Sequence, residues 1–185
     1  MAGRPTRVFT IGHSTRDLDE VLAMLQANDV TRLVDVRSYP SSRAFPQWNQ
    51  DAIVASLGDR MGYEWIRELG GRRHTPAGVV SANDGWRVKA FRSYADYMAT
   101  PEFHAGLRRL LQAAADDVPA IMCSEAVPWR CHRRLITDAL LVRGVEVLDI
   151  MSETLTREAA LTPFARVDGE EISYPKEDDR DDGRP

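Results

Sequence analysis

The chain has 185 residues, of which 43% are hydrophobic and 28% charged, and its formal net charge at pH 7 is −4. This length and composition suit a single soluble globular domain, and no apolar run is long enough for a transmembrane helix. Because the basic N-terminus lacks the apolar stretch of a secretory signal, we expect a cytoplasmic protein with no membrane partner.

The N-terminal half of the sequence predicts strands and helices in alternation. A short apolar run at residues 8–12 predicts a buried strand, and residues 32–36 and 63–66 are the second and third predicted strands. Apolar residues at helical spacing predict a helix between the first two strands, at residues 17–28. Asn49 can cap a second helix, which carries Ile53 and Leu57. The segment 69–87 that follows the third strand is long and irregular, and such segments are usually functional or mobile.

The C-terminal half continues the alternation. The pattern predicts helices at residues 91–98 and 101–114 and strands at residues 119–123 and 145–150. Pro128 is expected to begin a last helix that ends near Gly144. After one domain at residues 1–167, we expect an acidic, mobile tail at residues 168–185, in which Ile172 and Tyr174 can pair as a short edge strand.

This order of elements predicts an α/β domain, with a mainly parallel sheet of about five strands and helices on both faces. In such a fold, ligands bind beyond the carboxyl ends of the strands. Polar side chains follow every predicted strand at that edge, and a purely structural domain has little reason to repeat this pattern. We therefore expect the functional site there.

The segment from Cys123 to Arg134 holds the densest group of reactive side chains. If a helix begins at Pro128, Cys131 and His132 fall in its first turn, where free N–H groups favour an anion and lower a cysteine pKa. The alternative is that Cys131 packs as a small apolar residue and that the neighbouring arginines are solvated. A phosphatase loop does not fit, because six residues rather than five separate Cys123 from Arg130 and one of them is a glutamate.

Three further residues can take part in acid–base chemistry. Asp35 and Glu125 are the stronger candidates, although Asp35 can instead form a buried ion pair with Arg37 or Arg133. His13 is as suited to a structural hydrogen bond as to proton transfer.

A bound metal ion is a second interpretation of the same residues. Cys123, Cys131, His132 and His13 are acceptable ligands for zinc or iron, and Glu125 can complete such a site. Seven residues separate the two cysteines, whereas the usual zinc spacing is two to four.

A non-catalytic nucleotide or nucleic-acid binding module is the third interpretation. Five aromatic residues lie in loops near the same edge, where they can stack on a base: Tyr39, Phe45, Trp48, Trp86 and Trp129. The near-neutral charge of residues 1–167 gives no broad basic footprint for nucleic acid.

Several segments carry motifs specific enough to compare with known families: TIGHSTRDLDEVLAML, RLVDVRSYPSSR, LGGRR, FRSYADYM and IMCSEAVPWRCHRRLITDALLVRGVEV. Together they resemble the bacterial family called domain of unknown function 488, from about Phe9 to Ile150. Its most specific motif is C-x-E-x5-CHR. The resemblance implies a shared site in His13, Asp35, Arg37 and the cysteine segment, and it implies no particular reaction.

The first hypothesis is an enzyme that acts on a small anionic or nucleotide-like substrate. Its catalytic residues would be Cys123, Glu125, Cys131, His132, His13 and Asp35. The anion would be bound by Arg37, Arg72, Arg133 and Ser14. The metal protein and the binding module are the alternatives, so the sequence leaves open whether the chain is an enzyme.

Overall fold

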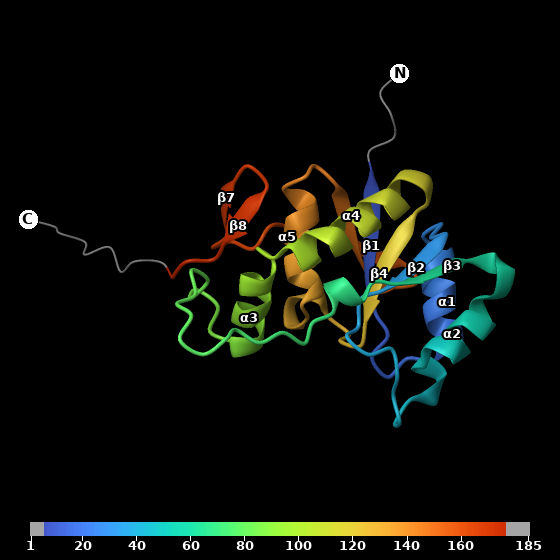
Figure 1. The fold of residues 1–185 in the computed structure, drawn as a ribbon. Coiled ribbons are helices and arrows are strands. Elements are labelled where there is room, and N and C mark those ends of the chain that lie inside the picture. The colour runs from blue at the N-terminus through green and yellow to red at the C-terminus, as the bar shows by residue number, and fades with distance from the viewer. Residues whose placement is uncertain (1–5, 177–185) are drawn as a thin grey trace, which may run out of the picture.

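A computed structural model describes residues 6–176 of the chain (Figure 1). Its helices are α1 (Leu18–Gln26), α2 (Gln50–Leu57), α3 (Lys89–Tyr97), α4 (Pro101–Asp116) and α5 (Arg133–Leu141). Its strands are β1 (Arg7–Gly12), β2 (Arg32–Asp35), β3 (Gly62–Trp65), β4 (Pro119–Cys123), β5 (Glu146–Ser152), β6 (Leu155–Glu158), β7 (Arg166–Asp168) and β8 (Glu171–Ser173). No helix within residues 6–176 has both the length and the apolar character needed to cross a membrane.

The main sheet has the strand order β3-β2-β4-β1-β5-β6. The first five strands are parallel, and β6 runs antiparallel to β5. The five predicted strands are confirmed, with ends that shift by no more than two residues. The predicted α/β fold class is therefore correct.

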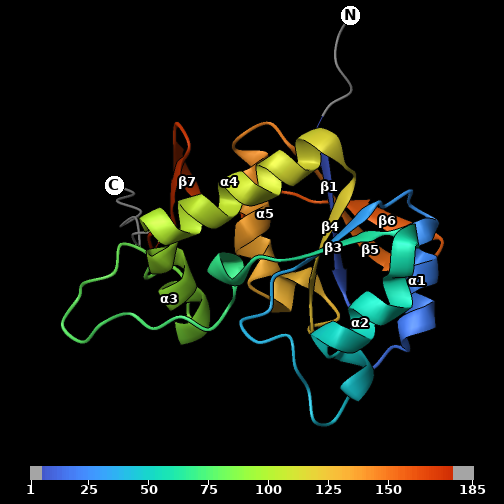
Figure 2. The same ribbon diagram turned by 45° about the vertical axis from the view of Figure 1, so that its right-hand side comes forward.

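Helices cover both faces of this sheet, α1 and α2 on one side and α3, α4 and α5 on the other (Figures 1 and 2). The alternation of side chains along each strand fills both layers. In β1, for example, Val8 packs into the layer of α3 to α5, whereas Phe9 and Ile11 pack against α1 and α2. Since α1 follows β1 on one face and α5 follows β4 on the other, the chain changes sides where these two central strands end, which is where ligands bind in open parallel sheets.

The ends of β1 and β4 are held together beyond the sheet itself. The backbone N–H of His13 donates to the carbonyl of Cys123 at 3.0 Å, and that of Ser14 donates to the carbonyl of Ser124 at 2.9 Å. A Cβ atom on Gly12 would lie 1.7 Å from the carbonyl oxygen of Glu125. Only glycine at this position lets the two strand ends approach so closely.

The predicted start of the last helix at Pro128 is wrong. Pro128 begins the short 3₁₀ turn η4 (Pro128–Arg130), and α5 starts only at Arg133. A proline in the first position suits both kinds of helix, so the sequence does not distinguish them. Cys131 and His132 consequently precede α5 instead of lying within its first turn.

The segment expected to form the tail begins inside a hairpin. Strand β8 pairs with β7, and Ile172 lies opposite Val167. Tyr174 is fully buried, and its hydroxyl donates to Asp138 at 2.8 Å. The boundary predicted at residue 168 thus falls within the β7–β8 hairpin, and residues 177–185 of the expected tail lie outside the described residues.

Candidate functional site

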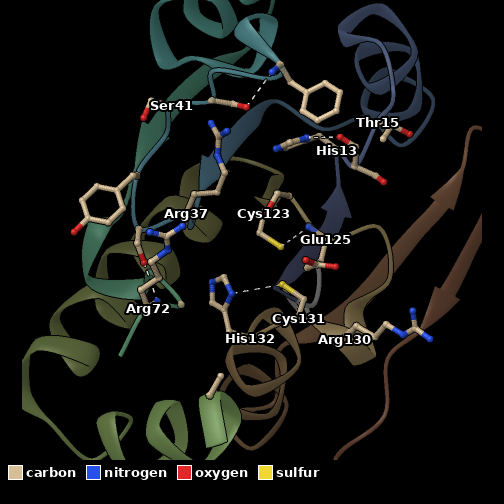
Figure 3. Close-up of a pocket in the computed structure, with 18 of the residues that line it drawn as sticks. His13, Thr15, Arg37, Ser41, Arg72, Cys123, Glu125, Arg130, Cys131 and His132 are labelled. Atoms are coloured by element: carbon tan, nitrogen blue, oxygen red, sulfur yellow. Dashed lines mark hydrogen bonds between the residues drawn. The ribbon is translucent and has the colours of Figure 1, made fainter. Parts of the chain in front are cut away.

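A cavity of about 800 Å³ opens at the carboxyl ends of the central strands (Figure 3). This volume suits a small-molecule ligand. Of the ten residues that the sequence analysis singled out, eight line the cavity: His13, Ser14, Arg37, Arg72, Cys123, Glu125, Cys131 and His132. The other two, Asp35 and Arg133, are buried beside it and are not among the lining residues.

The two cysteines face each other across the floor of the cavity (Figure 3). Cys123 is the last residue of β4, and Cys131 lies between η4 and α5. Their sulfur atoms and a ring nitrogen of His132 all lie within 4.8 Å of one another. Each sulfur also accepts a backbone N–H at 3.4 Å, from Glu125 for Cys123 and from Arg133 for Cys131.

The ring of His132 is fixed with a lone pair toward Cys131. Its Nε2 lies 2.9 Å from the carbonyl oxygen of Val36. A carbonyl can only accept, so Nε2 carries the hydrogen and Nδ1 is the unprotonated nitrogen, 3.5 Å from the Cys131 sulfur. Gly71 packs against this ring, because a Cβ atom there would lie 2.5 Å from Nδ1. Burial lowers the pKa of His132, which favours the neutral form.

Arg133 supplies a buried positive charge beneath the thiols. Its side chain is only 1% exposed, and its guanidinium donates to Thr10 Oγ1 at 3.1 Å and to the carbonyl of Glu125 at 2.6 Å. Among residues 6–176, no carboxylate forms an ion pair with it, and its Nε has no partner. A buried cation is costly without a counter-charge, and a thiolate at the cysteine pair can provide one.

These surroundings affect the two thiols in opposite directions. Burial raises the pKa of Cys123 well above its usual range, and its hydrogen bond to Cys131 raises it further. Burial also opposes ionisation of Cys131. There, however, the hydrogen bond from Cys123 and the charge of Arg133 prevail and lower the pKa of Cys131 to about 6.

Asp35 forms an ion pair with Arg37 and does not line the cavity. It is fully buried and accepts hydrogen bonds from Arg37 Nη2 at 2.5 Å and from the Tyr63 hydroxyl at 3.0 Å. Arg37 Nη1 also donates to the carbonyl of Trp48 at 2.8 Å. The ion pair considered from the sequence is therefore present, and it orients the guanidinium that lines the cavity.

His13 occupies the opposite wall from His132 (Figure 3). Its ring stacks on Trp48 at a centroid distance of 4.2 Å, and its Nδ1 donates to the carbonyl of Ser14 at 3.0 Å. The lone pair on Nε2 is buried and has no partner among the described residues. Burial lowers the pKa of His13 to about 4, so the ring is neutral near pH 7 and can accept a hydrogen bond. Ser14 adopts a φ of 49°, a conformation that non-glycine residues adopt mainly at constrained sites.

Charged side chains of both signs stand at the rim. Arg72, Arg130 and Glu125 are exposed lining residues. The backbone N–H of Arg72 donates to Ser38 Oγ at 2.9 Å, and its guanidinium lies 5.6 Å from the centre of the Tyr39 ring. Tyr39 and Phe45 also line the cavity, whereas Trp48 and Trp86 are buried.

The sequence analysis missed several residues that support this site. Thr10 is the one polar side chain in the apolar run of β1, a usable signal, and it links Arg133 to Asp149. Tyr63 lies opposite Leu33 in the sheet, and its hydroxyl donates a hydrogen bond to Asp35. The residues next to Tyr63 in the sequence give no sign of this hydrogen bond. No side-chain pattern could reveal the role of the Val36 carbonyl, which belongs to the backbone.

The family model called "Domain of unknown function DUF488" matches residues 17–140. The matched stretch includes Arg37, both cysteines and His132, and it begins after His13. Comparison with curated proteins and comparison with solved structures each give no match. Since the family match covers more than half of the sequence, the chain belongs to the DUF488 family.

Proposed function

We propose that the chain is an enzyme that binds a small anionic substrate in this cavity and attacks it with the thiolate of Cys131. The observation that carries the proposal is the placement of that sulfur. It lines the cavity, accepts the N–H of Arg133 at 3.4 Å, and lies close to a buried guanidinium without a carboxylate partner among the described residues. A thiolate is the nucleophilic form of cysteine, and such surroundings favour it.

The walls of the cavity offer the contacts that an anionic substrate needs. Arg37 is held by Asp35 and Trp48, so its remaining N–H groups are already oriented, and Arg72 adds a positive charge at the rim. Opposite them, the neutral Nε2 of His13 can accept a hydroxyl or amino hydrogen of the substrate. His132 Nδ1, 3.5 Å from the Cys131 sulfur, can accept the thiol proton when the thiolate forms.

Alkylation across pH tests the nucleophile. We expect Cys131 to react with iodoacetamide with a midpoint near pH 6, the lowered pKa of its thiol, and faster than a free model thiol below pH 8. The alkylation rate of each cysteine is measured separately, that of Cys131 in the variant Cys123→Ser and that of Cys123 in the variant Cys131→Ser. If neither thiol reacts faster than the model compound, the proposal is wrong.

Comparison of two reagents tests the preference for an anion. Iodoacetate carries a negative charge and iodoacetamide does not, so the ratio of their rates at Cys131 should exceed the ratio for a free thiol. Arg72→Gln should reduce this ratio and leave the iodoacetamide rate unchanged. An unaltered ratio would show that Arg72 does not attract the anion.

A metal ion is the second candidate, and one observation favours it. Cys123, Cys131 and His132 present three ligand atoms within 4.8 Å of one another. The Val36 carbonyl fixes the His132 ring as outer partners of metal-bound histidines do. With Zn²⁺, two thiolates and one imidazole would leave a fourth position toward the cavity, as in catalytic zinc sites. His13 lies outside this group of three.

Metal analysis separates the two candidates. Protein purified without chelator or affinity metal should contain about one zinc or iron per chain if the ion is resident, and Cys123→Ser should lose it. Substoichiometric metal in every preparation, together with no competition against a zinc indicator, would reject the metal site.

A further inference from the structure

We propose that Cys123 and Cys131 form a dithiol–disulfide couple, in which Cys131 attacks a hydroperoxide and Cys123 resolves the product as an intramolecular disulfide. This inference rests on the proposed function, because it uses Cys131 as the attacking sulfur. It adds a class of oxidant and a role for the second thiol.

The positions of the two sulfurs support a direct bond between them. Both line the cavity, and they lie within 4.8 Å of each other. A disulfide requires about 2 Å between sulfurs. The connecting segment between the two cysteines contains the short turn η4 and otherwise irregular backbone, so a small approach need not disrupt a helix or a strand ladder. Cys123 and Cys131 are also the only cysteines in the chain.

The surroundings of the two sulfurs assign their roles. Cys131 accepts the N–H of Arg133 and lies near the buried guanidinium, and the lone pair of His132 Nδ1, 3.5 Å from its sulfur, can take up the thiol proton. These contacts favour the thiolate that attacks. Cys123 ends a fully buried strand, and within residues 6–176 the N–H of Glu125 is the one backbone donor to its sulfur, so it keeps its proton until it attacks.

The reaction balances as two steps. The Cys131 thiolate attacks one oxygen of hydrogen peroxide, the O–O bond breaks, and the leaving hydroxide takes up a proton to give water and a sulfenic acid. The sulfur of Cys123 then attacks the Cys131 sulfur, the S–O bond breaks, and the thiol proton leaves with the hydroxide as a second water. The two thiols lose two electrons in total, and the peroxide gains them.

Intact mass after oxidation tests the couple. Reduced protein, freed of reductant, is mixed with one equivalent of hydrogen peroxide and then denatured in the presence of N-ethylmaleimide. We expect a monomeric product that is lighter by two hydrogens and carries no maleimide. A product that gains oxygen while Cys123 is still alkylated, or a disulfide between two chains, overturns the proposal.

Two variants test the direction of the reaction. Cys123→Ser should stop at the sulfenic acid of Cys131, which dimedone traps. Cys131→Ser should consume peroxide at least about tenfold more slowly than the wild type, because the remaining thiol is protonated. Equal rates in the two variants would overturn the assignment of the attacking sulfur.

This result is separable from that of the alkylation experiment. Rapid alkylation of Cys131 without an intramolecular disulfide leaves the proposed nucleophile standing and rejects only the couple. Slow alkylation of Cys131 rejects the proposed function, whatever peroxide does.

Discussion

Replacement of Arg133 by methionine isolates the contribution of the buried charge to the reactivity of Cys131. Methionine has a similar length and no charge, so it can fill the space that the 1%-exposed arginine occupies. Arg133 is among the groups that lower the pKa of Cys131 to about 6 against the effect of burial. Without the guanidinium, the pKa of this thiol should rise.

The size of the effect follows from Coulomb's law. Two unit charges about 4–6 Å apart, at an effective dielectric constant near 20, attract by roughly 3–4 kcal/mol. Since about 1.4 kcal/mol corresponds to one pH unit, the midpoint for Cys131 should rise by about two to three pH units. At pH 7 the thiolate fraction would then fall from roughly nine-tenths to roughly one-tenth or less.

The alkylation rate at a single pH would hide most of this change. A thiolate of higher pKa is intrinsically more nucleophilic, by roughly six- to tenfold for about two pH units, and this gain nearly offsets the smaller thiolate fraction. The midpoint itself must therefore be measured, from the ultraviolet absorbance of the thiolate as a function of pH. The Cys123→Ser background leaves Cys131 as the one titrating cysteine.

Arg134→Met is the matched control. It removes the same charge one residue further along α5, where the side chain donates to Thr162 at 3.0 Å and stacks 5.3 Å from the ring centre of Trp86. We expect this variant to leave the midpoint within about half a pH unit of the parent. If Arg133→Met folds, as judged by circular dichroism, and also leaves the midpoint there, Arg133 does not stabilise the thiolate.

Three further outcomes can be tested with single substitutions. Gly71→Ala should displace the His132 ring, because the added carbon would lie 2.5 Å from Nδ1, and should slow alkylation of Cys131 severalfold. Gly62→Ala, where the nearest contact of the added carbon is 3.5 Å, should leave the alkylation rate unchanged. Equal alkylation rates in the two variants would contradict this expectation. His13 stays neutral in the fold, because its pKa is lowered to about 4, but takes a proton near pH 6.5 when unfolded, so stability is lost as pH falls between these values. In urea unfolding, the free energy of unfolding of the wild type should fall by about 3 kcal/mol more than that of His13→Gln over this pH range. Parallel plots of unfolding free energy against pH would refute this expectation. Tyr174→Ala should cost about 3–5 kcal/mol of unfolding free energy, because the side chain is fully buried, and a loss below about 1 kcal/mol would place it outside the core.

The central strands β1, β2 and β4 were predictable because each is largely apolar and mostly buried, whereas β3 at the edge of the sheet is only half-buried. All five residues of strand β4 are buried, and its predicted bounds, residues 119–123, agree with the structure. By contrast, all four residues of β6 are exposed, so its sequence carries no apolar signal. It forms because β5 offers it a free edge, and pairing with an edge depends on tertiary structure.

The position of the site was predictable for a different reason. In a parallel sheet, residues that follow the strands must meet at one edge, so the order of elements alone brings His13, Arg37 and the cysteine segment together. That order does not determine which side chains remain available to a ligand. Asp35 stands one residue before the end of the predicted strand, and Arg133 is the first residue of α5; both face inward and are occupied by neighbours distant in sequence.

The arginines at the cavity differ in whether a carboxylate neutralises them, and under the proposed function this difference separates capture of the substrate from its reaction. Arg37 is neutralised by its ion pair with Asp35, so within the cavity it acts as an oriented donor, whereas Arg72 and Arg130 at the exposed rim have no ion-pair partner among residues 6–176. The charge that can attract an anion therefore lies at the entrance, and the charge of Arg133 lies below the sulfur, out of contact with the cavity. Under the proposed function, an anion attracted by the rim arginines would reach the Cys131 thiolate without binding to an unpaired cation on the way. For this reason, rim substitutions should affect capture of the substrate, and substitution of Arg133 should affect the nucleophile.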